Sequence, residues 1–139
     1  LKDHPESNFF HFNVDLAQGP CVIKRLRGCG AGCEYVAITP EGDIYPCHQF
    51  VGNEDYRLGS VHDGTFDKEL SGRFAGLNIY TREECRDCWA RFYCSGGCSA
   101  SNLLVNGDIK KPHRVGCELE RKRLECAIAL RAIAAGMAD

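Results

Sequence analysis

Apolar and polar residues alternate near the start of the chain, in residues 9–16. This period of two is typical of a half-buried strand. The opposite face carries His11 and Asp15, which favours a solvated face, although in a larger protein the pair could line a cavity. Residues 21–26 favour a second short strand after the turn at 19–20. The apolar positions of the first strand are Phe10, Phe12, Val14 and Leu16.

The middle of the chain has the pattern of short elements joined by turns. Residues 34–39 and 43–47 flank Pro40-Glu41-Gly42, where proline sets the first turn torsion and Gly42 can adopt a positive φ. A β-hairpin is therefore predicted, with Cys47 at the end of its second strand. Two further elements are expected, a short strand at 56–61 and a short helix at 67–77 that its glycines weaken.

Two helical segments are predicted in the second half. Thr81 and Glu84 have the spacing of a capping box, so a helical turn should begin there and present Cys85 and Cys88 on one side. Apolar residues then recur at helical spacing from about 115 to 137. We expect this amphipathic helix to pack on the domain through an apolar stripe that Leu124 and Ile128 widen. The stripe consists of Leu119, Cys126, Leu130, Ile133 and Met137.

These elements predict an α+β fold, a small cysteine-rich domain with a β-hairpin, irregular cluster-binding loops and a long C-terminal amphipathic helix. With 139 residues, of which 44% are hydrophobic, the chain has the length of one domain.

The net charge of −2, without long runs of one sign, argues against nucleic acid as a partner. No apolar run reaches the ~20 residues of a membrane helix. No signal peptide is visible at the start, so we expect a cytoplasmic protein with no membrane partner.

Ten cysteines in a cytoplasmic chain favour metal or redox chemistry over disulfides. Pairs of thiolates two residues apart can reach one ion or cluster. The uneven spacing and the number of thiols suit two cubane clusters with four ligands each, while structural zinc and a secreted disulfide scaffold are less favoured alternatives. The spacings are Cys29-x3-Cys33, Gly42-x4-Cys47, Cys85-x2-Cys88-x5-Cys94-x3-Cys98, and Cys117.

This pattern, from Cys29 to Cys117, resembles the SPASM domain, the C-terminal auxiliary-cluster extension of radical S-adenosylmethionine (radical SAM) enzymes that modify peptides and proteins. Within that family, residues 24–61 resemble the maturases of six-cysteine (SCIFF) peptides. Those enzymes install thioether links between a cysteine sulfur and the α-carbon of another residue.

The resemblance implies two sets of ligands for two auxiliary 4Fe-4S clusters. Cys29 fits the spacing of the motif better than Cys33, which is the candidate fourth ligand of the first cluster. Trp89, Phe92 and Tyr93 would shield the clusters from water, and the amides of 95–97 could donate to sulfur. The first set is Cys29, Cys33, Cys47 and Cys98, and the second is Cys85, Cys88, Cys94 and Cys117.

Several other side chains have less specific signals. Cys126 is interpreted as a small buried hydrophobic residue, and Cys21 has no assigned role. For His48, an ordinary structural role is favoured over a role as a neighbour of a cluster or a contact of the substrate. Six basic residues could offset anionic clusters or attract an acidic peptide, although such residues are more often solvated. They are Arg82, Arg86, Arg91, Lys110, Lys111 and Arg114.

The chain lacks the Cys-x3-Cys-x2-Cys motif that binds the S-adenosylmethionine-cleaving cluster in this enzyme class, so it should be inactive alone. Because it begins without methionine, we expect a piece of a longer enzyme. Residues 1–28 would lead from the barrel, residues 29–117 would form the SPASM domain, and residues 118–139 would form the packed helix.

By resemblance, the partners are the radical SAM barrel with its S-adenosylmethionine and third 4Fe-4S cluster, a cysteine-rich ribosomal precursor peptide (a RiPP), and an external electron donor. The clusters would bind or orient the substrate thiol and accept an electron. An anaerobic sulfatase-type maturase, a zinc-binding module without enzymatic activity and a free-standing electron carrier are the alternatives.

Overall fold

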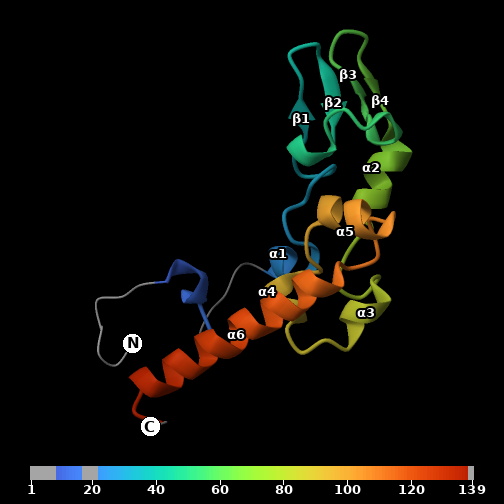
Figure 1. The fold of residues 1–139 in the computed structure, drawn as a ribbon. Coiled ribbons are helices and arrows are strands. Elements are labelled where there is room, and N and C mark those ends of the chain that lie inside the picture. The colour runs from blue at the N-terminus through green and yellow to red at the C-terminus, as the bar shows by residue number, and fades with distance from the viewer. Residues whose placement is uncertain (1–8, 17–21, 138–139) are drawn as a thin grey trace.

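The protein is described by a computed structural model that covers residues 9–16 and 22–137. The helices α1–α6, the strands β1–β4 and the short 3-10 helices η1–η3 confirm the predicted α+β class (Figure 1). In chain order the elements are η1 (Phe10–Phe12), α1 (Val22–Arg27), β1 (Ala37–Ile38), β2 (Asp43–Tyr45), η2 (His48–Phe50), η3 (Glu54–Tyr56), β3 (Gly59–Ser60), β4 (Thr65–Phe66), α2 (Lys68–Ala75), α3 (Glu83–Arg86), α4 (Arg91–Cys94), α5 (Ser99–Asn106) and α6 (Arg114–Ala134).

The four strands form an antiparallel sheet in the order β1-β2-β3-β4. The predicted hairpin is confirmed as β1 and β2, which pair Ala37 with Tyr45. Gly42 in the connecting turn has a φ of 85°, a conformation that glycine adopts without the cost of a Cβ. The strand predicted at 56–61 is confirmed as the shorter β3, and β4 is an additional strand that the sequence did not predict.

The hydrophobic core lies where the sheet meets α2. The ring of Phe50 packs edge-on against Phe74, with centroids 5.3 Å apart, and lies 5.0 Å from the ring of Tyr56. Ala100 of α5 and Ile109 extend this core toward the second half of the chain. In Figure 1 the sheet occupies one end of the molecule, and the long α6 runs through the other end beside α3 and α4.

The two strands predicted at the start of the chain are wrong. Residues 9–16 contain η1 followed by irregular backbone, because this segment contacts α6 instead of a neighbouring strand. Arg123 on α6 donates to the carbonyl of His11 at 2.6 Å. Residues 22–27 form α1, whose Lys-Arg-Leu-Arg sequence consists of good helix formers, and residue 21 lies outside the described residues.

The capping box predicted for Thr81 and Glu84 is also wrong, although the helical turn exists. The turn is α3, which begins after Arg82 and has no side-chain cap. The Thr81 hydroxyl instead bonds to the loop before α3, where it donates to the carbonyls of Gly76 and Asn78. These bonds close the loop that precedes α3.

The long C-terminal helix is confirmed as α6, and the face predicted to pack on the domain is confirmed only in part. Leu119 is 68% exposed and Met137 is 81% exposed, whereas Leu124, which widens the predicted face, is 1% exposed. The buried face is therefore centred on the side of α6 that carries Leu124 and Ala127. Among the described residues, no helix has the length and apolar character needed to cross a membrane.

Candidate metal centres

Four cysteines from three helices and one loop line a single cavity. They are the four predicted for the second cluster: Cys85, Cys88, Cys94 and Cys117. We refer to these four as the second thiol set. The structure thus brings together the four thiols that the family resemblance implied for the second cluster, and their role as ligands stays a prediction.

Local backbone geometry explains how the second thiol set converges. Cys85 lies in α3, and the amide of Cys88 bonds the Cys85 carbonyl at 3.1 Å, which keeps both thiols on one turn. Cys94 ends α4, and Cys117 lies in the first turn of α6. Helix α6 must therefore present its first turn to α3 and α4.

Burial and mutual repulsion disfavour the free thiolates of this set. Burial raises the pKa of Cys85 to about 11; Arg82 opposes the shift, and Cys94, Cys117 and Cys88 add to it. The pKa values of Cys94 and Cys117 are raised as well, first by burial. These cysteines are therefore neutral thiols on their own, and a cationic centre that binds them would stabilise their thiolates.

Backbone amides already point at one of these sulfurs. The amides of Gly96 and Gly97 hydrogen-bond Cys94 and oppose the rise of its pKa. Ser95, Gly96 and Gly97 have φ values of 59°, 87° and 73°, a left-handed run that turns the backbone around the sulfur. The predicted donation from residues 95–97 thus has structural support at the last two residues.

Arg91 supplies an independent sign that a group is accommodated here. It lines the cavity of the second thiol set and donates from Nη1 to the Cys88 carbonyl at 3.1 Å. Its Nε is buried and has no acceptor among the described residues. A buried donor without a partner is costly, and the sulfur atoms of an anionic cluster would satisfy it. The donor set and this orphaned donor both fit an iron-sulfur cluster.

The first thiol set consists of Cys29, Cys33, Cys47 and Cys98. Cys29 and Cys33 line a small cavity together with Gly97 and Ser99, the two neighbours of Cys98. Cys47 follows β2 and is buried, whereas the other three are exposed. The structure therefore brings Cys29 and Cys33 to one cavity, whereas Cys98 lines a different cavity together with Cys94 and Cys117 of the second thiol set.

Tyr35 and Gln49 each form a hydrogen bond to one sulfur of the first thiol set. The Tyr35 hydroxyl donates to the Cys29 sulfur at 3.9 Å, and Gln49 Nε2 donates to the Cys98 sulfur at 3.8 Å. Partial burial, followed by the nearby sulfurs of Cys29 and Cys47, raises the pKa of Tyr35 to about 12. Neither side chain was singled out from the sequence, because tyrosine and glutamine carry no metal-ligand signal.

Within residues 9–16 and 22–137, no three His, Cys, Asp or Glu side chains lie close enough together to hold a single metal ion. The ligands of a cubane cluster bind different iron atoms at its corners, so they lie further apart than the ligands of one ion.

The other cysteines, the histidine and the aromatic residues singled out from the sequence lie in different environments. Cys126 is partly buried on α6, away from both cavities, and His48 is exposed. Cys21 lies outside the described residues. The aromatic shield stays a prediction, because the large aromatic side chains near the thiols are 36% to 51% exposed and so only partly buried. They are Trp89, Phe92 and Tyr93.

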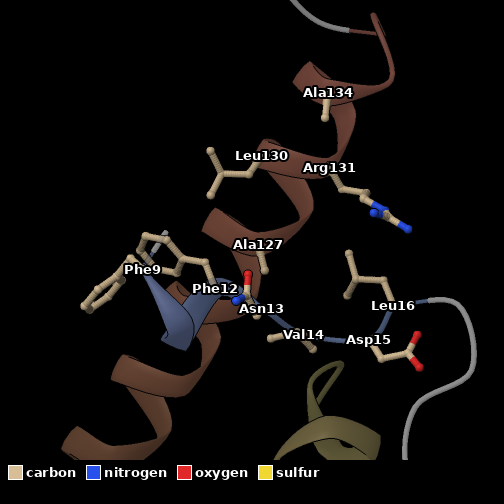
Figure 2. A pocket seen from close by; sticks show the side chains of 10 residues that line it. All are labelled: Phe9, Phe12, Asn13, Val14, Asp15, Leu16, Ala127, Leu130, Arg131 and Ala134. Atoms are coloured by element: carbon tan, nitrogen blue, oxygen red, sulfur yellow. The ribbon is translucent and has the colours of Figure 1, made fainter. Parts of the chain in front are cut away.

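The largest cavity lies elsewhere, between residues 9–16 and α6. Its volume is about 770 Å³, and Figure 2 shows Phe12, Leu130 and Leu16 around it, with Arg131 projecting from the helix. Asp15 lines this cavity, whereas His11 stacks on Phe10 with ring centroids 3.9 Å apart. The cavity contains no thiol, so it is separate from both metal centres.

Comparison with known proteins identifies the fold of the thiol-bearing segment. Residues 29–89 match the SPASM family, described as an iron-sulfur cluster-binding domain. This segment is a SPASM domain. The match includes the first three cysteines of the first thiol set and the first two of the second, and Cys94, Cys98 and Cys117 follow it in the chain.

Three relatives have names that indicate their activities. The chain is 31% identical to a mycofactocin maturase of Mycobacterium ulcerans over 76% of its own length and 29% of the relative. It is 28% identical to a PqqA peptide cyclase of Xanthomonas axonopodis pv. citri, over 68% of the chain and 27% of the relative. It is 28% identical to a serine-type anaerobic sulfatase-maturating enzyme of Klebsiella aerogenes, over 59% of the chain and 20% of the relative. The chain thus spans less than a third of the length of the curated relatives it matches.

Proposed function

We propose that this chain supplies two auxiliary 4Fe-4S clusters to a radical SAM enzyme that modifies a ribosomally made, cysteine-rich peptide. The first thiol set would hold one cluster and the second thiol set the other. The observation that carries the proposal is the cavity of the second thiol set, where four thiols and the orphaned Arg91 donor surround one space. The matched SPASM domain and the peptide-modifying relatives support the same function.

The domain boundaries follow from this assignment. Residues 1–28 would connect to the radical SAM barrel, residues 29–117 would hold the clusters, and residues 118–139 would continue the helix that carries Cys117. S-adenosylmethionine and a third 4Fe-4S cluster would belong to the barrel. The precursor peptide and an external electron donor would be the partners of the complete enzyme, which we place in the cytoplasm.

The two thiol sets suggest different roles in thioether formation. A cluster at the first set would supply a Lewis-acidic iron for the substrate thiol and a place for the surplus electron. Cys29, Cys33 and Cys98 are exposed, so a peptide can approach this set from solvent, whereas Cys85 is buried. The second set would therefore serve electron transfer and structure.

Cys33 is central to the thioether version of this proposal. Its side chain is exposed and its sulfur donates to the Gly30 carbonyl at 3.4 Å, within a glycine-rich loop. If Cys33 is displaced when a substrate thiol binds, Cys33→Ser should keep nearly all the iron, whereas Cys29→Ser or Cys47→Ser should lose the first cluster alone. Equal iron loss in all three variants would identify Cys33 as an ordinary ligand and would remove the support for thiol binding.

Iron analysis tests the central proposal. After anaerobic reconstitution the chain should carry about eight irons and eight sulfides, as two cubane clusters. Stoichiometric zinc without iron under the same conditions would contradict it and favour a zinc-binding module. Zinc found after aerobic purification is not decisive, because vacant thiolate sites readily bind zinc.

An anaerobic sulfatase-type maturase is the second candidate, supported by the relative of that name. Mass spectrometry of products separates the two functions in the complete enzyme. A thioether maturase should lower the mass of a cysteine-rich peptide by two hydrogens per crosslink without removing sulfur. Conversion of a sulfatase serine to an aldehyde, with no crosslinked peptide, would favour the second candidate.

A further inference from the structure

Arg82 is a buried cation that forms no ion pair with a carboxylate in the part of the chain that the structure describes. Its residue is 4% exposed, and none of the ion pairs in the described residues includes it. Its Nη1 donates to the carbonyls of Ile109 and Lys110 at 2.8 and 3.1 Å, and its Nη2 donates to Ser99 Oγ at 3.1 Å. These acceptors are all neutral, so the positive charge is not compensated by the groups it bonds.

The Nε of Arg82 is buried and has no acceptor among the described residues. It lies against Gly96, where an added Cβ would be 2.9 Å from this nitrogen. Gly96 sits in the middle of the three-residue bridge that joins Cys94 to Cys98. Arg82 therefore packs against the one short segment that carries a ligand of each cluster.

The backbone and the side chain of Arg82 also contact residues at or next to other ligands of both centres. The carbonyl of Arg82 accepts a hydrogen bond from the Cys85 amide at 3.0 Å, which ties it to the second thiol set. Its bond to Ser99 reaches the residue after Cys98, which belongs to the first set. Burial lowers the pKa of Arg82, and negative charge at Cys85, Cys94, Asp108 and Cys98 opposes that shift.

We infer that Arg82 is a positioning residue shared by the two cluster sites, a buried positive charge that raises the reduction potential of both clusters. The inference rests on the proposed cluster binding. Each cluster gains negative charge when it is reduced, and a nearby cation in a low-dielectric site stabilises the more negative form. The uncompensated charge and the unused Nε donor of Arg82 provide this stabilisation at the bridge between the two sites.

The experiment compares three variants of the anaerobically reconstituted chain. Arg82→Gln removes the charge, Arg82→Lys keeps it, and Arg86→Gln is the control, because Arg86 lies one residue from Cys85 and is exposed. Iron content and redox titrations followed by electron paramagnetic resonance are measured for each. Repeating the titrations with Cys47→Ser or Cys88→Ser leaves one cluster at a time and assigns each potential.

In Arg82→Gln we expect the reduced-to-oxidised ratio of each cluster, at a fixed potential, to fall about tenfold, a shift of about 59 mV for a one-electron couple. Arg82→Lys should retain most of the wild-type potential, and Arg86→Gln should change it little because solvent screens its charge. If Arg82→Gln loses its clusters while Arg82→Lys keeps them at the wild-type potential, the charge requirement is likewise upheld.

Three results would overturn the inference. They are unchanged potentials in Arg82→Gln, a shift confined to one cluster, and equal loss of iron in Arg82→Gln and Arg82→Lys, which would reduce Arg82 to a structural contact. Absence of iron from the wild-type chain is a separate result, since it would refute the proposed function itself.

Discussion

Replacing Gly32 by alanine should destabilise the chain and remove the first cluster while leaving the second. Gly32 lies between Cys29 and Cys33 and has a φ of 78°. Its amide donates to the carbonyls of Tyr35 and Pro46, at 3.0 and 2.9 Å. These bonds hold the loop of the first two thiols against the residue that precedes Cys47.

The magnitude has two parts. An L-residue in the left-handed region costs roughly 1–2 kcal/mol. A Cβ at Gly32 would also lie 2.9 Å from Cγ of Phe74, close to the root of a ring that is buried against Phe50 and cannot swing away. Overpacking of this kind costs about 1–3 kcal/mol, so the total loss in the free energy of unfolding should be about 2–5 kcal/mol.

Gly52→Ala is the matched control. Gly52 has a φ of 84°, and a Cβ there would meet no atom within 4 Å, so only the backbone cost of about 1–2 kcal/mol remains. Urea unfolding of the cluster-free chain, followed by circular dichroism, measures both losses. Iron analysis after reconstitution should give about half the wild-type iron for Gly32→Ala and full iron for Gly52→Ala. Equal losses of stability together with full iron in both variants would refute the reasoning.

Three further outcomes test the packing and the thiol assignment. Leu124→Ala should lower the free energy of unfolding by about 2–5 kcal/mol, whereas Leu119→Ala should change it by less than about 0.5 kcal/mol; equal losses in urea unfolding would show that the buried face of α6 is misassigned. Cys126→Ser should retain full iron and Cys117→Ser should lose the second cluster, and iron loss in Cys126→Ser would contradict the second thiol set. Removing iron with a chelator should increase hydrogen exchange in residues 85–117, because thiols that a metal holds together repel or disperse without it; unchanged protection there would refute the dependence on metal.

The parts of the fold that sequence predicts well are those that local chemistry determines. Pro40-Glu41-Gly42 specifies a turn whatever surrounds it, and the hairpin formed as expected. The long helix follows from a period that repeats over many residues. Residues 9–16 show an equally regular alternation, but a strand also needs a neighbouring strand to bond with, and the chain supplies α6 there instead. The local sequence of a segment does not indicate which other segment it will pack against in the folded chain.

The candidate site also has features that local sequence predicts and features that depend on tertiary packing. The two-residue gap between Cys85 and Cys88 limits how far these thiols can separate, but the placement of Cys117 in the second thiol set came from the family resemblance and stays a prediction. The six basic residues near the cysteines cannot be distinguished by sequence alone, yet in the structure they differ in burial and in what they contact. Arg82 is buried at the bridge between the two sets, and Arg91 reaches into one cavity, whereas Arg86 is exposed. Burial of a charge depends on tertiary packing that charge alone does not reveal.

Helix α6 shows how the site constrains the fold. Part of its apolar stripe, which includes Val115 and Leu119, faces solvent at 54% and 68% exposure. Hydrophobic burial alone would turn this stripe inward. Cys117 lies in the first turn of the same rigid helix, and its thiol must face the cavity shared with Cys85. Because a helix rotates as one body, fixing the direction of one ligand fixes the buried face over all its turns. The direction of the Cys117 thiol is therefore consistent with the burial of Leu124 and the exposure of Leu119.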